Sequence, residues 1–164
     1  MMRTESSSRS GIGFDVHAFA DDRPLVLGGV TIPSERGLAG HSDADVLSHA
    51  IADAILGGAA LGDLGDYFPD DDDRWAGADS TEFVVRSAAM IRPVALRVVC
   101  VDATVILEEP KIGKYRPQIR ALLAEVLGLE IDRVSVKAKT TDGLGFIGRG
   151  EGAAALAVVT LEST

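Results

Sequence analysis

The 164-residue chain has one cysteine, three histidines and few aromatic residues, which make up 5% of it. The lone Cys100 cannot form an intrachain disulfide or a thiolate metal site, so we expect a reducing compartment and, because its neighbours are apolar, a core position for Cys100. No apolar run approaches the ~18–20 residues that span a membrane. The polar first nine residues lack the apolar segment of a signal peptide. The sequence therefore predicts a soluble, cytoplasmic protein without a membrane partner.

Positive charge is also scarce, because 16 basic residues face 25 acidic ones and leave a net charge of −9. This balance argues against nonspecific nucleic-acid binding. An anionic substrate would therefore need bound metal and a few well-placed cations to reverse the local field. The length fits one domain with one buried core. A hydrophobic fraction of 46% with 18 glycines is typical of a compact α/β protein.

Hydrophobic periodicity predicts strands that alternate with helices in a single domain over residues 11–162, after a polar tail over residues 1–10. The expected strands are Gly11–Phe19, Leu25–Leu27, Val30–Ile32, Val94–Leu107, Val134–Thr140 and Ala153–Leu161. The expected helices run from an N-cap at Ser42 to Gly57-Gly58, from Asp79 to a point before Pro93, and over Tyr115–Leu127 with a stop at Gly128. This order favours an α/β (α+β) fold, with a single mixed sheet, helices packed on one face and a ferredoxin-like arrangement.

All three histidines lie in two short segments near the N-terminus. Asp15 and His17 are two residues apart on a predicted strand, so they point to the same face, and His49 lies in a predicted helix. Together they offer three ligands suited to zinc with an open fourth position. The alternative, an ordinary buried polar histidine, is weakened by this clustering. Asp45 and Asp53 lie four residues either side of His49, where each either bonds its second ring nitrogen or belongs to a solvated helix face.

Three glycine-containing segments give weaker signals. Gly11-x-Gly13 lies inside a strand with no helix directly after it, so it is no dinucleotide fingerprint; we expect its glycines to let the backbone approach a ligand. Gly62–Asp73 is expected to be a loop in which an aspartate binds polyol hydroxyls, although such acidic runs are usually just solvated. Lys137–Gly152 could cradle phosphate, with Asp142 as an oxygen ligand for a Mg²⁺-like ion, or could be a plain hairpin.

A resemblance to a known family covers nearly the whole of Gly11–Leu161. It rests on motifs that follow one another in order: Gly13-Phe14-Asp15-Val16-His17, Gly37-Leu38-Ala39-Gly40-His41-Ser42-Asp43, Leu61-Gly62-Asp63-Leu64-Gly65, Phe68-Pro69-Asp70, Pro110-Lys111 and Leu144-Gly145-Phe146-Ile147-Gly148-Arg149-Gly150-Glu151-Gly152. The chain resembles the 2-C-methyl-D-erythritol 2,4-cyclodiphosphate synthase family of the non-mevalonate isoprenoid pathway. The reaction that this resemblance implies is an intramolecular phosphoryl transfer that closes a cyclic diphosphate and releases CMP, a phosphorus–oxygen lyase activity.

The resemblance also implies the site residues. Zinc would be bound by Asp15, His17 and His49, and a Mg²⁺ or Mn²⁺ ion that bridges the substrate phosphates would contact Asp142. His41 and Thr140 would stabilise the transition state. The implied substrate site comprises Asp15, His17, His41, Ser42, Asp63, Gly65, Phe68, Asp70, Asp72, Pro110, Lys111, Thr140, Thr141, Asp142, Phe146 and Arg149.

The resemblance further implies a homotrimer with active sites between subunits, in which Leu107–Gly113 of one subunit forms the cytidine and phosphate site of its neighbour. Phe146, Arg149 and Glu151 would line a cavity near the threefold axis, where an isoprenoid diphosphate can bind. Some members are fused to a cytidylyltransferase domain, and this chain is short enough to be monofunctional.

Two positions depart from the family pattern. Asp142 stands where the family usually has Glu, so its shorter side chain contacts the ion directly or through water. Lys139 stands where Thr is frequent, and its charge could add to phosphate binding. Two other readings of the zinc site stay open: a zinc-dependent hydrolase of nucleotide diphosphates, and a non-catalytic trimeric binding protein with a structural metal.

Overall fold

Two long antiparallel strands form the centre of the sheet, in a computed structural model that describes residues 7–164. The five-stranded sheet has the order β4-β1-β7-β5-β6, in which only β5 and β6 are parallel. A separate hairpin pairs β2 with β3 around the expected Gly28-Gly29 turn. The strands are β1 (Ser8–Asp21), β2 (Leu25–Leu27), β3 (Val30–Ile32), β4 (Arg36–Leu38), β5 (Leu96–Ile106), β6 (Val134–Lys139) and β7 (Gly152–Ser163).

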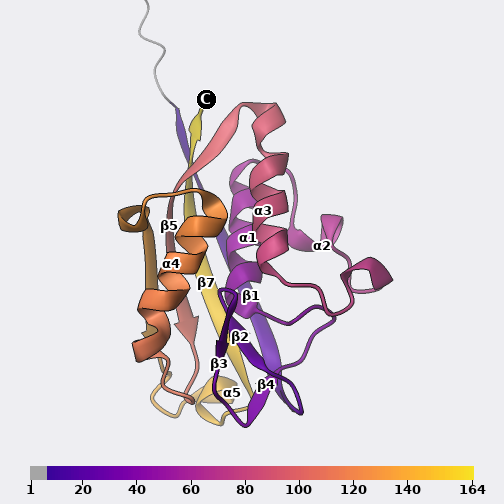
Figure 1. The fold of residues 1–164 in the computed structure, drawn as a ribbon, viewed down its shortest axis with the longest axis vertical. Helices are drawn as coiled ribbons and strands as arrows, with labels where there is room; N and C mark the ends of the chain where they lie inside the picture. Colours follow the sequence, from indigo (N-terminus) through magenta and orange to yellow (C-terminus); the bar gives the residue numbers. More distant parts are fainter. Residues whose placement is uncertain (1–6) are drawn as a thin grey trace, which may run out of the picture.

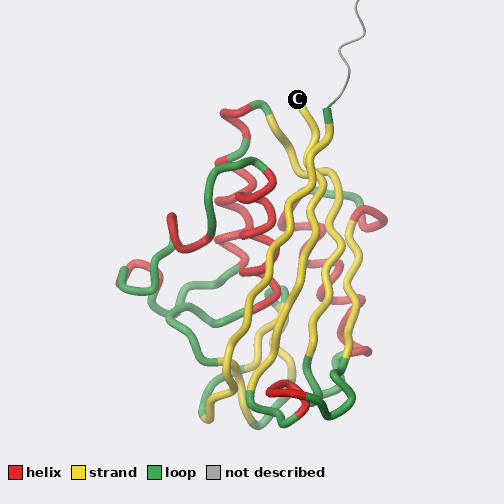
Figure 2. Tube along the Cα trace, turned by 180° about the vertical axis from the view of Figure 1, so that it is seen from behind, coloured by secondary structure: helices red, strands yellow, loops and turns green. Residues whose placement is uncertain are grey.

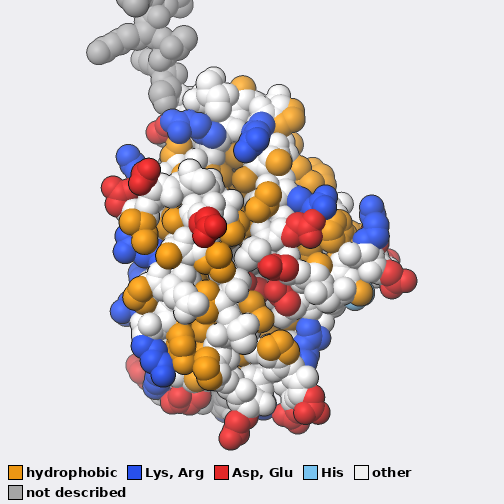
Figure 3. Space-filling model, viewed as in Figure 1, with side chains coloured by type: hydrophobic (Ala, Val, Ile, Leu, Met, Phe, Trp, Pro, Cys, Tyr) orange, Lys and Arg blue, Asp and Glu red, His pale blue; other side chains and the backbone are white. Residues whose placement is uncertain are grey.

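Three longer helices cover one face of this sheet, and the strands are bare when the protein is seen from behind (Figures 1 and 2). They are α1 (Val46–Gly58), α3 (Thr81–Met90) and α4 (Arg116–Leu127). The mixed sheet with helices on one face is thus confirmed, although it is not the single sheet expected, because β2 and β3 form a second one. Charges of both signs are interspersed over the helix-covered side (Figure 3). In the part of the chain that the structure describes, no helix is long and apolar enough to cross a membrane.

The chain order of the long strands differs from the ferredoxin-like arrangement. That arrangement follows β-α-β-β-α-β, whereas here β1, β5, β6 and β7 occur with the longer helices only after β1 and β5. In this chain β7 lies between β1 and β5. The observed fold and the ferredoxin-like arrangement therefore have one split β-α-β unit in common and no further connection. The parallel pair β5–β6 is joined through α4, as a parallel connection requires.

The bare face of the sheet carries an apolar strip. Ile12 is 66% exposed and Phe14 60% exposed, and their partners across the ladder are Val158 and Leu156. Cross-strand partners point to the same face, so the four side chains form one continuous surface. We call Ile12, Phe14, Leu156 and Val158 the apolar strip.

On the opposite face, β1 packs against α1 at unusually short range. A Cβ atom on Gly11 would lie 1.8 Å from the carbonyl oxygen of Ala54, and one on Gly13 would lie 1.9 Å from that of Ala50. The expectation that these glycines admit a ligand is therefore wrong, because the backbone of the helix fills the space. This close packing brings His49 on α1 over the residues of β1.

Several boundaries differ from those expected. β1 begins at Ser8, so the expected tail is wrong for residues 8–10, which pair with β7, while residues 1–6 of that tail lie outside the described residues. The Gly62–Asp73 loop contains a short helix, α2 (Leu64–Tyr67), because Asp63 and Asp66 form a capping box. Cys100 is half-buried rather than in the core, since the ladder between β5 and β7 is irregular there.

Asp45, not Ser42, caps α1. The Asp45 carboxylate accepts hydrogen bonds from the amides of Leu47 and Ser48, both at 3.1 Å. The Ser42 hydroxyl accepts from the amide of Ala44 at 3.2 Å and also lies within hydrogen-bond range of two side chains that belong to the site described below. Serine and aspartate are both good N-caps. Asp45 caps the helix because the Ser42 hydroxyl is hydrogen-bonded elsewhere.

Candidate metal centre and active site

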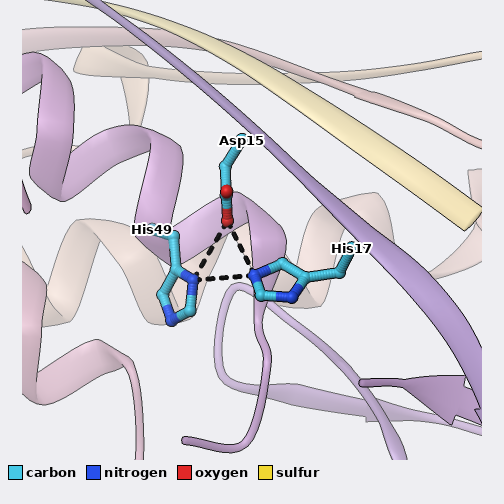
Figure 4. A group of neighbouring side chains, drawn as sticks. All are labelled: Asp15, His17 and His49. Carbon is cyan, nitrogen blue, oxygen red and sulfur yellow. Dashed lines mark hydrogen bonds and ion pairs between the residues drawn. The ribbon is translucent and has the colours of Figure 1, made fainter. Parts of the chain in front are cut away.

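Asp15 and His17 extend from β1, and His49 extends from α1, toward one point (Figure 4). Asp15 Oδ2 lies 2.9 Å from His17 Nε2 and 3.0 Å from His49 Nδ1, and the two nitrogens are 3.1 Å apart. Ligands bound tetrahedrally to zinc at about 2.0–2.2 Å are roughly 3.3–3.6 Å apart. The triangle of donor atoms therefore matches one small cation to within a few tenths of an ångström.

The hydrogen-bond partners on the far sides of both rings determine which nitrogens offer a lone pair to the centre of the triad. His17 Nδ1 lies 2.6 Å from the carbonyl oxygen of Ala39, which can only accept, so His17 carries its proton there and turns the lone pair of Nε2 inward. His49 Nε2 contacts the hydroxyls of Ser80 and Ser42 at 2.9 and 3.1 Å. A nitrogen, a second nitrogen and a carboxylate oxygen thus converge, and this donor set suits zinc with one position left open.

The charges of the triad are already strongly coupled within the protein. Burial alone would raise the pKa of Asp15, but the hydrogen bonds that His17 and His49 donate when their rings are protonated outweigh it and hold that pKa well below its ordinary value. Burial would lower the pKa of His17, but its pair with Asp15 raises that pKa above 6.5. The Asp15 carboxylate is thus ionised and attracts positive charge to this point, whether a proton or a metal ion.

The triad lies at the wall of a cavity of about 450 Å³. The cavity gathers most of the expected substrate residues of the N-terminal half: Asp15, His17, His41, Ser42, Asp63, Gly65, Phe68 and Asp70. Asp72 does not line it; its carboxylate binds Arg74, and its carbonyl oxygen lies 2.9 Å from His41 Nε2. Asp72 therefore tethers the ring of His41 through its backbone rather than through its acid.

Aromatic side chains that the sequence did not single out complete this cavity. Trp75 and Phe83 line it beside Phe68, and the rings of Phe68 and Phe83 stack with centroids 4.5 Å apart. Phe83 also lies under the His49 ring, at 5.7 Å between centroids. From the sequence alone, Trp75 and Phe83 would be assigned to the apolar core, because nothing in their spacing points to a ligand.

Neither Asp45 nor Asp53, the two aspartates on the helix of His49, bonds its ring. Asp45 is fully buried at the start of α1, where it binds backbone amides. Asp53 lines the cavity and accepts a hydrogen bond from the amide of Leu64 at 3.1 Å. Burial raises the pKa of Asp53. The partners of His49 Nε2 are instead Ser42 and Ser80, and Ser80 lies 31 residues away along the chain, where no helical spacing could reveal it.

The remaining expected residues lie elsewhere in the single chain. Pro110, Lys111 and Thr140 line a second cavity, of about 310 Å³, that shares no lining residue with the first. Lys139 and Arg116 also line it, so it is the more basic of the two.

The loop beside this second cavity is held by Glu108. Its carboxylate accepts from the amide of Thr141 at 2.8 Å and from that of Gly143 at 3.4 Å. The hydrogen bond from the Thr141 amide is the main cause that holds the pKa of Glu108 below its ordinary value. Asp142 is held at a φ of 54° and accepts a hydrogen bond from Thr140 at 3.2 Å. The loop thus presents Thr140 and Asp142 on a fixed backbone.

Phe146 belongs to the short helix α5 (Gly145–Gly148) at the lower end of the sheet (Figure 1). Its side chain is 40% exposed. Arg149 follows α5 and pairs with Glu151, with 2.6 Å between Nε and Oε1. These residues lie outside both cavities in the single chain.

This fold and site define a class: an α+β protein with a three-ligand metal site beside an acidic, partly aromatic cavity. The chain matches the YgbB family over residues 8–162. A relative from Rubrobacter xylanophilus is 57% identical and covers 94% of each chain, and one from Solibacter usitatus is 54% identical and covers 96% of this chain and 99% of its own. Both are named 2-C-methyl-D-erythritol 2,4-cyclodiphosphate synthase. The chain belongs to this family.

Solved structures agree with the sequence relationship. The bifunctional IspDF from Campylobacter jejuni matches with a TM-score of 0.94 and 41% identity, over 98% of this chain and 43% of that one. The IspF–CDP complex from Plasmodium falciparum matches with a TM-score of 0.83 and 31% identity, over 96% and 97% of the two chains. The chain thus corresponds to a whole IspF chain and to less than half of the bifunctional protein.

Proposed function

We propose that this chain converts 4-diphosphocytidyl-2-C-methyl-D-erythritol 2-phosphate into 2-C-methyl-D-erythritol 2,4-cyclodiphosphate and CMP. The observation that carries the proposal is the Asp15–His17–His49 triad at the wall of the cavity of about 450 Å³. It is supported by full-length relatives that are named for this product. As a lyase of the non-mevalonate pathway acting on a soluble metabolite, the protein would work in the cytoplasm.

The reaction needs geometry and charge more than a protein nucleophile. An oxygen of the 2-phosphate forms a bond to the β-phosphorus while the bond from that phosphorus to the α,β-bridging oxygen breaks, and CMP leaves with the electron pair. A phosphate monoester has its second pKa at ~6 and is mostly dianionic at neutral pH. No strong general base is therefore required, and holding the reacting groups in line can lower the barrier by roughly 7–11 kcal/mol.

Asp15, His17 and His49 would hold zinc, which when bound polarises a phosphoryl oxygen. His41 supports this geometry because its ring is tethered to the carbonyl oxygen of Asp72 at the cavity rim. There it would stabilise charge that develops on the phosphate. The acidic wall, which includes Asp63, would accept hydrogen bonds from the hydroxyls of the methylerythritol moiety, and the stacked aromatics would exclude water.

We further propose a homotrimer whose active sites form between subunits. The two cavities described above share no lining residue, which supports a substrate site built from residues of two chains. Pro110 and Lys111 would bind the cytidine and phosphates, with Thr140 and Thr141 beside them and Asp142 as a ligand of a Mg²⁺ or Mn²⁺ ion carried by the substrate. The apolar strip, left bare by the helices (Figure 2), supports association between chains.

The threefold arrangement would also bring three copies of Phe146 and Arg149 together. An exposed phenyl ring and a guanidinium suit an isoprenoid diphosphate, whose chain is apolar and whose head is anionic. Arg149 is paired with Glu151 in the single chain, so such a ligand would have to compete with that carboxylate.

A ³¹P NMR assay with the cytidylyl substrate tests the activity. Cyclic diphosphate and CMP are expected with added zinc and magnesium, with loss of turnover under a chelator and recovery on zinc addition. His49→Ala should lose zinc and cyclisation together. A linear phosphate product would favour a hydrolase instead, and full turnover in zinc-free protein would overturn the assignment.

Light scattering after size exclusion tests the trimer. Ile12→Lys, in the apolar strip, is expected to yield monomers. Val85→Lys, on α3, is the matched control, because Val85 is 47% exposed but lies on the helix-covered side. A trimer that survives Ile12→Lys would exclude the strip as its interface.

A further inference from the structure

The hydrogen bonds behind His49 form a chain that ends on a carboxylate. His49 Nε2, on the side of the ring away from Asp15 and His17, lies 2.9 Å from Ser80 Oγ. The Ser80 hydroxyl in turn makes a short hydrogen bond with Asp43 Oδ1. Ser42 Oγ joins the same chain, 3.0 Å from Ser80 Oγ. Ser80 is fully buried and Ser42 is 4% exposed, so water does not compete for these bonds.

The ends of this chain fix the direction of every proton in it. An ionised carboxylate can only accept, so Ser80 must donate its proton to Asp43. The oxygen of Ser80 then has only lone pairs left for His49 and Ser42. Ser42 already accepts from the amide of Ala44, and it donates to Ser80. His49 is therefore the remaining donor, with its proton on Nε2.

Ser80 gives up a common structural role to make these bonds. It occupies the N-cap position of α3, yet its hydroxyl makes no capping hydrogen bond there. Asp79 binds the free amide of Thr81 at 2.9 Å instead. Asp43 also anchors this corner, since it accepts from the amides of Ser80 at 3.2 Å and Asp45 at 3.1 Å. The Ser80 hydroxyl thus binds the ring of His49 on α1 and does not cap its own helix, α3.

We propose that Ser80 and Asp43 are positioning residues for the metal centre. They hold His49 with its proton on Nε2, which leaves the lone pair of Nδ1 for the ion, and an imidazole bonded in this way is a stronger ligand. The Ser42 hydroxyl belongs to this network, so Ser42 would reach a substrate phosphate by a group other than that hydroxyl. The inference rests on the metal site of the proposed function but not on the cyclisation.

Metal affinity of the full-length protein is the first test, measured by competition of zinc and Co²⁺ with a chromogenic chelator. Ser80→Ala is expected to weaken binding by about 10- to 100-fold, the usual effect of losing such a partner. Ser87→Ala is the matched control: Ser87 is also buried on α3, but its hydroxyl has no partner among the described residues. The control should bind within twofold of wild type. Equal affinity of Ser80→Ala and wild type would overturn the proposal.

The second test needs no variant. The chain has only three histidines, so long-range ¹H–¹⁵N correlation spectra of the zinc-loaded protein can assign each ring. We expect the proton of His49 on Nε2 with slow exchange, and faster exchange in Asp43→Asn. A proton on Nδ1 would overturn the proposal even if Ser80→Ala failed to fold. Since neither measurement uses turnover, a protein that binds metal as expected but forms no cyclic diphosphate would contradict only the proposed reaction.

Discussion

His17 Nε2 and His49 Nδ1 face each other at 3.1 Å, and each ring is bound on its far side by a different kind of partner. A backbone carbonyl holds His17 and a buried serine holds His49. Both partners draw the ring protons away from the centre, so two lone pairs and the Asp15 carboxylate meet there. Without a metal ion, only an added proton can relieve this repulsion, which agrees with the raised pKa of His17.

The stability of the metal-free protein should therefore depend on pH through this pair. Because the pKa of His17 is raised above 6.5, its contribution is fully present below pH 6.5 and is lost as the pH rises through the raised value. Because the pKa of Asp15 is lowered from 3.8, its contribution is present above pH 3.8 and is lost only as the pH falls through the lowered value.

The comparison of wild type with Asp15→Asn isolates this effect. With chelator present, the difference in free energy of unfolding should be largest between about pH 4 and pH 6.5 and should shrink at higher pH. Urea titrations at each pH, at one protein concentration, provide the measurement. A difference that stays constant from pH 5 to pH 9 would show that the proton of His17 is not held by Asp15.

Arg23 is expected to position His41. Its guanidinium donates to the carbonyl oxygens of Gly40 and Ser42, both at 2.7 Å, and so fixes the backbone on each side of His41. Arg23→Ala should lower kcat by about 10- to 100-fold, since a misplacement of 1 Å can cost that much, and it should leave zinc affinity unchanged. Arg23→Lys, which can reach one carbonyl but lacks the fork, should lie between. Loss of zinc together with activity would point instead to general disruption of the site.

Spacing on a strand was sufficient to find the metal ligands, but not their supports. Asp15 and His17 share a face because the side-chain period of a strand is two, and the helical period carried His49 toward them. The bond from His49 to Ser80 joins two helices across 31 residues, and no periodicity encodes such a contact. Local chemistry also predicted Ser42 as the cap of α1, and only the tertiary partners of Ser42 explain why Asp45 caps the helix instead.

Gly11 and Gly13 show that packing partners, too, cannot be identified from the sequence. Their sequence indicates a close backbone approach, which the structure confirms, but the approaching group is helix α1 and not a ligand. A glycine in a strand indicates that another group approaches the backbone closely, but it does not indicate which group. The fold was more predictable, since the expected core helices and strands follow from periodicity, whereas the order of strands in the sheet depends on long-range pairing.

Asp45 should be one of the most important side chains for stability. Besides capping α1, its carboxylate accepts from the amides of Gly28 and Gly29 at 2.9 and 2.7 Å, and so ties the β2–β3 hairpin to the helix. Asp45→Ala would leave buried donors without partners and should cost about 3–5 kcal/mol. Asp79→Ala, which removes an exposed cap from α3, should cost about 1 kcal/mol. Urea unfolding at equal protein concentration compares the two variants. Similar losses in free energy of unfolding would contradict the role of Asp45 in joining the hairpin to α1.

Asp142 should determine the requirement for the second metal ion more than the binding of substrate. The Glu108 carboxylate holds the adjacent backbone at Thr141, so Asp142→Asn keeps the loop and removes only a charge. Asn tolerates the positive φ of this position about as well as Asp does. The Mg²⁺ concentration for half-maximal activity should rise about tenfold, because an amide oxygen is a weaker ligand than a carboxylate.

The matching control is Asp132→Asn, an exposed aspartate ahead of β6 that lines neither cavity. It should leave the Mg²⁺ titration unchanged. At saturating Mg²⁺ the KM for substrate should change by less than about twofold in Asp142→Asn, since recognition of the cytidine and the polyol does not pass through this carboxylate. An unchanged Mg²⁺ titration in Asp142→Asn would exclude Asp142 as the ligand and leave the ion to the substrate phosphates and water.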